Sequence, residues 1–200
     1  MCLRGDYEAI KIIKSKRDLL EKQGIRLIND YVNSEISVII SPLKDTPEYS
    51  VYYKDIKDLK NVIYEEDPEK ALFKAIAYPK SKFNHVIVGI DPGMLCGYVI
   101  LGDGIAIGEG KISCNLIGNT IKKELEKIPY VNKEVILGSG EGWIIAGNSL
   151  LKNGLSYKIV REDEVAKFIP KTPILKIFKD KDVRSAMAIA LRGSRNWMDH

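Results

Sequence analysis

The sequence predicts an α/β protein in which a small α+β module, residues 1–80, precedes a larger domain, residues 81–200. Strand and helix patterns alternate in the larger domain, which is typical of a sheet with helical crossovers. Residues 86–90 form an apolar run rich in β-branched residues, the pattern of a strand buried on both faces. Polar and turn-forming residues at 79–84 separate this run from a preceding helix and mark the expected linker.

The first module is expected to combine helices with short strands around a small core. The pattern predicts a helix over 7–23 between Asp6 as N-cap and Gly24, strands 25–29, 36–40, 49–53 and 62–64, a helical piece over 55–60, and a helix over 68–78 that begins after Asp67. No catalytic constellation stands in this module. Its tyrosines could stack on bases, but tyrosines in short strands usually pack, among them Tyr49, Tyr52, Tyr53 and Tyr64.

The second domain follows the order βββαβαβα. The predicted elements are strands 86–91, 97–101 and 105–112, helix 118–128, strand 134–138, helix 143–152, strand 156–160, a short helix near 163–168 and helix 182–192. The first three strands form an antiparallel meander with tight turns. The later crossovers require that the first, fourth and fifth strands run parallel.

Composition is that of a soluble globular protein, with 45% hydrophobic and 29% charged residues. The apolar runs are much shorter than the roughly 20 residues of a membrane helix, so no membrane partner and a cytoplasmic location are expected. The cysteines, Cys2, Cys96 and Cys114, are odd in number and lack CxxC spacing. They are therefore expected to be reduced thiols, without a disulfide framework or a zinc site.

Positive charge is concentrated in the second domain. Residues 1–80 hold 14 basic and 14 acidic residues, whereas residues 81–200 hold 17 and 13. Residues 165–195 alone carry eight basic residues against Asp180 and Asp182. Such a run indicates either a phosphate-binding surface or an ordinary solvated face.

Asp91 stands at the end of the buried strand, immediately before Pro92 and Gly93. In an open α/β sheet, ligands collect at the carboxyl ends of strands. An aspartate before Pro-Gly is also a common turn residue, so both interpretations remain open.

The element order resembles the RuvC-like branch of the ribonuclease H-like fold. The resemblance covers about residues 84–193 and rests on Gly89-Ile-Asp-Pro-Gly93 and Gly97-Tyr98 at its head and on Asp182-Val-Arg-Ser-Ala-Met-Ala-Ile-Ala-Leu191 at its end. It implies a mixed five-stranded sheet of order 3-2-1-4-5 and a divalent-metal nuclease site. The implied acidic residues are Asp91, Glu141 and Asp182, while Ser185 stands where junction resolvases carry a second acid on the last helix.

Carboxylates alone suit Mg²⁺ or Mn²⁺, which could support attack of water on a phosphodiester. Lys179, Lys181 and Arg184 flank Asp182 and could hold the phosphates of the expected partner, a structured DNA or RNA. The resemblance also implies a homodimer. Trp143 after the acidic loop could stack on an unpaired base or pack at the edge of the core.

Each acidic residue has an ordinary alternative, since Asp182 fits a helix N-cap and Glu141 suits the start of helix 143–152. The main alternative to a nuclease is therefore a catalytically degenerate module that binds nucleic acid, and the neutral Ser185 is the residue that suggests it. The glycine-rich loops also resemble phosphate loops of actin-like ATPases and sugar kinases. In those proteins two ribonuclease H-like domains face each other across a cleft, whereas this sequence predicts one such domain. Asp163 joins the site in a minor variant of the nuclease hypothesis.

Overall fold

The computed structural model describes residues 2–3, 11, 14–25, 39–41, 62–65, 67–161, 163–165 and 177–194. The chain divides into two units, described separately below. The N-terminal unit comprises Met1–Lys82 with Lys127–Pro129, and the C-terminal unit comprises Phe83–Glu126 with Tyr130–His200.

The N-terminal unit contains a small parallel sheet in the order β1-β2-β3. Its elements are β1 (Cys2–Leu3), α2 (Arg17–Glu21), β2 (Ile39–Ser41), β3 (Val62–Tyr64) and α4 (Pro68–Ile76). Gly24, at a φ of 83°, follows α2 where the sequence places the helix stop. The predicted strands 25–29 beyond Ile25 and 49–53, the helical piece 55–60 and the cap Asp6 lie outside the described residues.

Helix α4 begins where the sequence predicts it. The Asp67 carboxylate accepts hydrogen bonds from the backbone N–H groups of Glu69 and Lys70, at 2.9 and 3.1 Å, so it is the N-cap. The buried face consists of Ala71, Leu72, Phe73 and Ala75. The helix ends at Ile76, two residues before the predicted end, and continues as a turn.

The C-terminal unit is a five-stranded sheet in the order β6-β5-β4-β7-β8. The strands are β4 (Phe83–Asp91), β5 (Cys96–Gly102), β6 (Ile105–Ile112), β7 (Tyr130–Gly138) and β8 (Lys158–Val160). Strands β4, β7 and β8 run parallel, and β5 and β6 are antiparallel to their neighbours. This is the 3-2-1-4-5 order of the ribonuclease H-like fold, so the predicted fold class and topology are confirmed.

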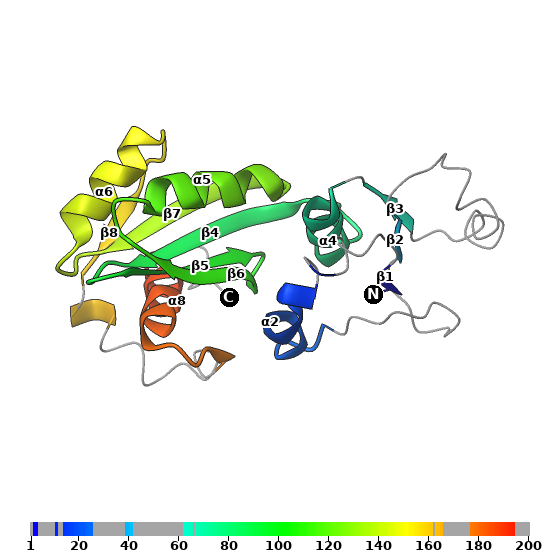
Figure 1. Ribbon diagram of the computed structural model, residues 1–200, viewed down its shortest axis with the longest axis horizontal. Coiled ribbons are helices and arrows are strands. Elements are labelled where there is room, and N and C mark those ends of the chain that lie inside the picture. Colours follow the sequence, from blue (N-terminus) through cyan, green and yellow to red (C-terminus); the bar gives the residue numbers. More distant parts are fainter. Residues whose placement is uncertain are drawn as a thin grey trace. The chain divides into compact units, whose positions relative to one another are not determined.

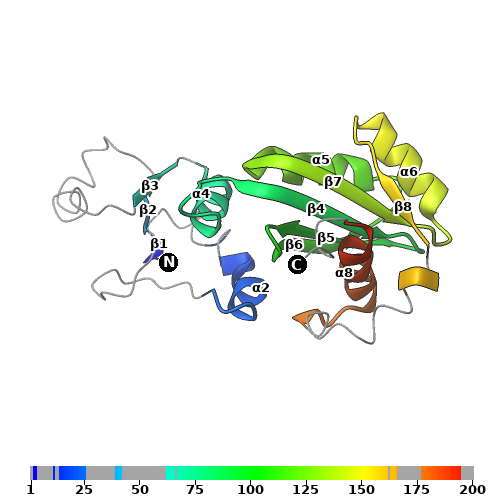
Figure 2. The same ribbon diagram turned by 180° about the vertical axis from the view of Figure 1, so that it is seen from behind.

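Helices cover both faces of this sheet. Helices α5 (Ile117–Lys127) and α6 (Trp143–Lys152) lie on one face, and α8 (Lys181–Gly193) lies on the other (Figure 1). The view from behind shows the same division (Figure 2). Because both faces are covered, Val86 to Ile90 are all buried, as their apolar run predicts.

Within the part of the chain that the structure describes, no helix combines the length and the apolar character needed to cross a lipid bilayer.

Strand β6 contains a β-bulge. Ile100 of β5 pairs with Gly108, whereas Leu101 pairs with Ala106, so Ile107 is one extra residue in β6. A one-residue shift exchanges the two faces of a strand. The residues of β6 beyond the bulge therefore face opposite to the direction that a regular hairpin would give them.

The expectation of reduced thiols is wrong for two of the three cysteines, because Cys96 and Cys114 form a disulfide. Cys96 begins β5 and pairs in register with Ile112 at the end of β6, so the chain returns Cys114 to the same end of the hairpin. Their Cα atoms are 5.0 Å apart, a usual disulfide separation. The sequence spacing of 18 residues hides this proximity, which the hairpin creates.

Candidate functional site

Three neighbouring strands place Asp91, Gly97 and Lys111 in one row across the sheet. Asp91 of β4 pairs with Gly97 of β5, and Gly97 pairs with Lys111 of β6. Residues directly opposite each other on paired strands carry their side chains on the same face. Asp91 and Lys111 therefore stand on either side of a glycine, facing the same way.

The first turn of α8 lies directly over this glycine. A Cβ atom built on Gly97 would come within 2.7 Å of the Asp182 carbonyl carbon and oxygen and within 2.9 Å of the Asp182 Cβ. Two residues before Asp91, a Cβ on Gly89 would meet the Ala186 carbonyl oxygen at 2.1 Å. The absence of side chains at these two positions lets α8 approach the sheet, and it brings Asp182 into the row between Asp91 and Lys111.

Asp180, and not Asp182, caps α8. Its carboxylate accepts hydrogen bonds from the backbone N–H groups of Asp182 and Val183, at 2.8 and 3.2 Å. The bond from Val183 is the main reason that the pKa of the Asp180 carboxyl is lowered. The alternative explanation of Asp182 as the N-cap is therefore wrong, and its carboxylate is available for another role.

Lys111 forms ion pairs with both aspartates of this turn. Its Nζ contacts the Asp182 carboxylate and lies 3.4 Å from Oδ2 of Asp180. The hydrogen bond to Asp182 is the largest cause of a raised pKa for Lys111. A fixed positive charge thus stands at the carboxylate that the resemblance assigns to a metal ion.

Glu141 lies at the same end of the sheet but on another element. It belongs to the turn between β7 and α6, and its side chain is exposed. A Cβ on the next residue, Gly142, would lie 2.9 Å from the Gly93 carbonyl oxygen and 3.3 Å from the Cys114 Sγ. The turns that follow Asp91 and carry Glu141 are therefore in contact, and the disulfide packs against both.

Of the three predicted acidic residues, Asp91 faces the α8 side of the sheet, where the Asp182 backbone lies over its strand neighbour Gly97. Glu141 belongs to the turn that leads to the opposite face (Figure 1). Among the described residues, no group of three Asp, Glu, His or Cys side chains is arranged to hold a metal ion.

The chemistry of the donors, two carboxylates, is of the type that divalent cations such as Mg²⁺ take. Mg²⁺ is commonly held by one or two carboxylates, with water and substrate phosphate completing its coordination. Asp91 and Asp182 are carboxylates of this kind, and the Lys111 ammonium competes with a metal ion for Asp182.

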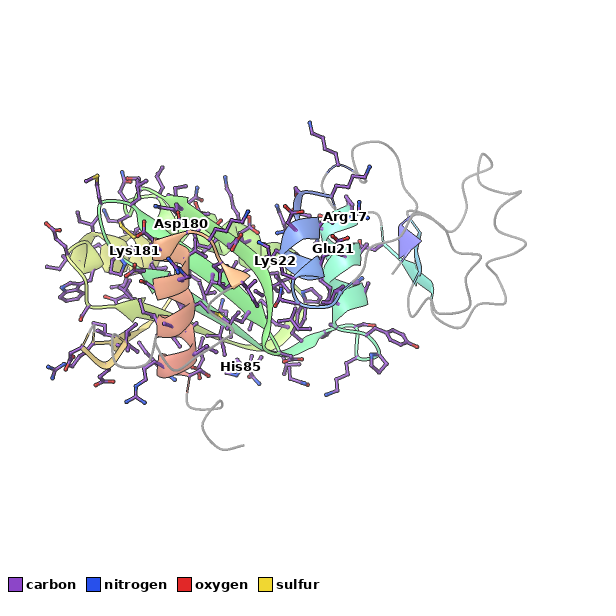
Figure 3. The ribbon with its side chains drawn as sticks, turned by 90° about the horizontal axis from the view of Figure 1, so that it is seen from below. Arg17, Glu21, Lys22, His85, Asp180 and Lys181 are labelled. Carbon is purple, nitrogen blue, oxygen red and sulfur yellow. A yellow bond between two sulfur atoms is a disulfide. The ribbon has the colours of Figure 1, made fainter. Side chains whose placement is uncertain are left out.

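The predicted phosphate-binding residues lie at the start of α8. Lys179, Lys181 and Arg184 are all exposed, and Figure 3 shows Asp180 and Lys181 at this end of the helix. Ser185 lies one turn beyond Asp182 on the same helix and is half-buried. Lys167, Lys171, Lys176 and Arg195 of the basic run lie outside the described residues.

Two further candidates stand apart from the row. Trp143 is the half-buried first residue of α6. Asp163 pairs with Arg161, whose Nε lies 3.1 Å from Oδ1 of the aspartate.

Sequence reasoning missed Lys111. A regular β5–β6 hairpin continued from the turn pairing of Leu101 with Ala106 would place Gly110 opposite Gly97. The extra residue at the bulge moves Lys111 into that position instead. A basic residue near the end of the third strand was the available signal, but its direction depends on a bulge that the apolar pattern does not reveal.

Comparison with protein-family models and with curated proteins finds no match for this chain. Among solved structures, it is similar to T. thermophilus RuvC in complex with a Holliday junction substrate. The sequence identity is 14%, the alignment covers 54% of this chain and 91% of RuvC, and the TM-score is 0.42.

Proposed function

We propose that the C-terminal unit is a divalent-metal-dependent nuclease that acts on structured DNA or RNA. The observation that carries this proposal is that the Asp182 backbone lies over Gly97, the residue that pairs with Asp91. Asp91 ends a strand and Asp182 begins a helix without capping it, and carboxylates are ligands that Mg²⁺ prefers.

In this proposal Asp91 and Asp182 hold the Mg²⁺ or Mn²⁺, and Glu141 joins them from the neighbouring turn. The bound metal would polarise a phosphodiester and lower the pKa of the attacking water. Asp91 and Asp182 orient the reacting phosphate through the positions of their carboxylates. Because α8 is packed on glycines, those positions are fixed before the substrate arrives.

The exposed cations at the start of α8 are proposed to hold the nucleic-acid backbone. Lys179, Lys181 and Arg184 lie within a few residues of Asp182 and have exposed side chains. Lysine and arginine contacts to phosphate give affinity and register without reading the sequence of bases. A substrate recognised by shape, such as a four-way junction or a folded RNA, suits this surface, and a homodimer would place two sites on one junction.

The test compares wild type with Asp91→Asn on labelled branched DNA and structured RNA, with Mg²⁺, Mn²⁺ or EDTA. Loss of a metal ligand removes several kcal/mol of transition-state stabilisation, so cleavage should fall by about 100-fold or more. Glu126→Gln is the matched control, because it removes an exposed carboxylate from α5. Cleavage that persists in EDTA or in Asp91→Asn would contradict the proposal.

A second candidate is a module that binds nucleic acid without cutting it. Ser185 in place of an acid and the ammonium of Lys111 on Asp182 favour it, since both reduce the negative charge that attracts metal ions. Retention of labelled junctions by wild type with no cleavage at any Mg²⁺ or Mn²⁺ concentration would select this function. ATP hydrolysis in the absence of nucleic acid would favour the kinase-like alternative.

A further inference from the structure

Many nucleases cleave phosphodiesters with two divalent ions about 4 Å apart. We propose that Lys111 takes the place of one of these two ions, so that the site binds one divalent cation and carries its other positive centre as a side chain. This inference rests on the proposed function and specifies its metal requirement. It begins from the contact between Lys111 and Asp182, which neither the strand pattern nor the resemblance predicts.

The position of Lys111 is determined by the backbone. The bulge at Ile107 turns Lys111 toward α8, and the register places it beside Gly97. With no side chain at Gly97, the Asp182 backbone rests on the sheet within reach of the lysine. The ammonium therefore meets Asp182 because of strand register and helix packing, and not through the chance position of a long surface side chain.

The charges of the site agree with one divalent ion. On the α8 face, Asp91 and Asp182 contribute two negative charges, and Lys111 reduces their sum to one. Asp180 is compensated separately, because its carboxylate accepts N–H groups at the positive N-terminus of α8. A single Mg²⁺ would leave one positive charge on this group, whereas two such ions would leave three.

Ser185 fits the same scheme. An acid at that position would add a further negative charge one helical turn beyond Asp182. The neutral hydroxyl of Ser185 and the ammonium of Lys111 both make the net charge of the site less negative. The two differences from a four-carboxylate site are thus complementary, since together they remove the need for one divalent ion.

A purely structural role for Lys111 makes a different prediction. If the lysine only ties α8 to β6, its loss should lower stability and leave the cation affinity of Asp91 and Asp182 unchanged. If it stands in for a metal ion, its removal should strengthen binding of divalent cations. A unit charge at contact distance changes the affinity for a divalent ion by about tenfold in a water-exposed site.

The experiment is a titration of the full chain with Mn²⁺, followed by the electron paramagnetic resonance signal of the free ion. Wild type is expected to bind one Mn²⁺ per chain. Lys111→Met should bind the first Mn²⁺ about tenfold more tightly, or take up a second ion, and the gain should shrink in high salt. Lys111→Arg retains the charge and should restore wild-type binding. Lys123→Met removes an exposed lysine from α5 and serves as the control.

Equal Mn²⁺ binding by Lys111→Met and Lys123→Met would overturn the inference and leave the nuclease proposal standing. Tighter binding by Lys111→Met without cleavage of any nucleic acid would support the inference while removing the nuclease activity. Absence of Mn²⁺ binding in wild type and in Lys111→Met alike would overturn both. Thermal unfolding followed by circular dichroism confirms that each variant is folded.

Discussion

Gly97 and Asp182 are packed so closely that a single added carbon on the glycine would lie 2.7 Å from the aspartate carbonyl. This contact joins the second strand of the meander to the first turn of the last helix. It therefore determines where the Asp182 carboxylate stands relative to Asp91 and Lys111.

Gly97→Ala should destabilise the protein and displace the start of α8. The new methyl group meets backbone atoms that cannot move independently, and overpacking of this kind costs about 1–3 kcal/mol. Urea denaturation measures the loss. Gly93→Ala is the matched control in the adjacent loop, since its Cβ would meet only the Leu95 carbonyl oxygen, at an ordinary 3.5 Å. Equal stability of the two variants would show that α8 does not rest on Gly97.

Asp180→Asn should change how stability depends on pH. Hydrogen bonds from the helix N-terminus lower the pKa of Asp180 in the folded protein, whereas an unfolded aspartate has a pKa of about 3.9. The charge of Asp180 therefore stabilises the fold above that unfolded value, and this contribution is lost as the pH falls through the lower folded pKa.

Asparagine also caps helices but does not titrate. The Tm of wild type should exceed that of Asp180→Asn by about 1–4 °C at pH 7, and this difference should vanish in strongly acidic solution. Scanning calorimetry from pH 7 to pH 2 provides the measurement. A Tm difference that stays constant over this range would contradict the role given to the Asp180 charge.

Ser149→Ala should remove a hydrogen-bonded link between α6 and the start of α5. The buried Ser149 hydroxyl donates to the Asn115 carbonyl oxygen at 2.8 Å and accepts from the Gly118 N–H at 3.0 Å. Its loss leaves both backbone groups without this partner and should lower the free energy of unfolding by about 1–3 kcal/mol. Ser156→Ala, at an exposed position, should change the stability little. Denaturant titration measures the free energy of unfolding of both variants. Equal values would show that the Ser149 hydroxyl does not stabilise the fold.

A thiol assay on the unfolded, unreduced chain should find one reactive cysteine of the three, and reduction should raise the count to three. Closing a loop of this length stabilises a protein by about 3 kcal/mol, so reduction should lower stability by that order. Cys2→Ser should reduce the unreduced count to zero. Three reactive thiols before reduction would contradict the Cys96–Cys114 bond.

The topology of the C-terminal unit could be predicted because its signals are local and agree with one another. The buried run before Asp91 identifies the central strand, and the alternation after it requires parallel crossovers. Predicted and observed elements differ mainly at their ends, as for β7, which begins at Tyr130 and not at 134. Its first residues lie beyond the buried part of the sheet, so their exposure hides the strand from an apolar pattern.

The site was harder to predict because it depends on strand register and on which of two nearby aspartates caps α8. Asp180 and Asp182 both fit an N-cap, and the hydrogen bonds to Asp182 and Val183 assign the role to Asp180. Lys111 reaches the site only because of the bulge in β6. The disulfide likewise joins residues that become neighbours when the hairpin closes.

The disulfide has a consequence for the outer edge of the sheet. Strand β6 is an edge strand, and such strands present unpaired backbone groups that can recruit another chain. If β6 separated from the sheet, it would expose the edge of β5 as well. Because the bond between Cys96 and Cys114 encloses both strands in one covalent ring, β6 cannot leave its neighbour completely. The disulfide therefore limits how far β5 and β6 can separate, which disfavours strand exchange and aggregation through this edge.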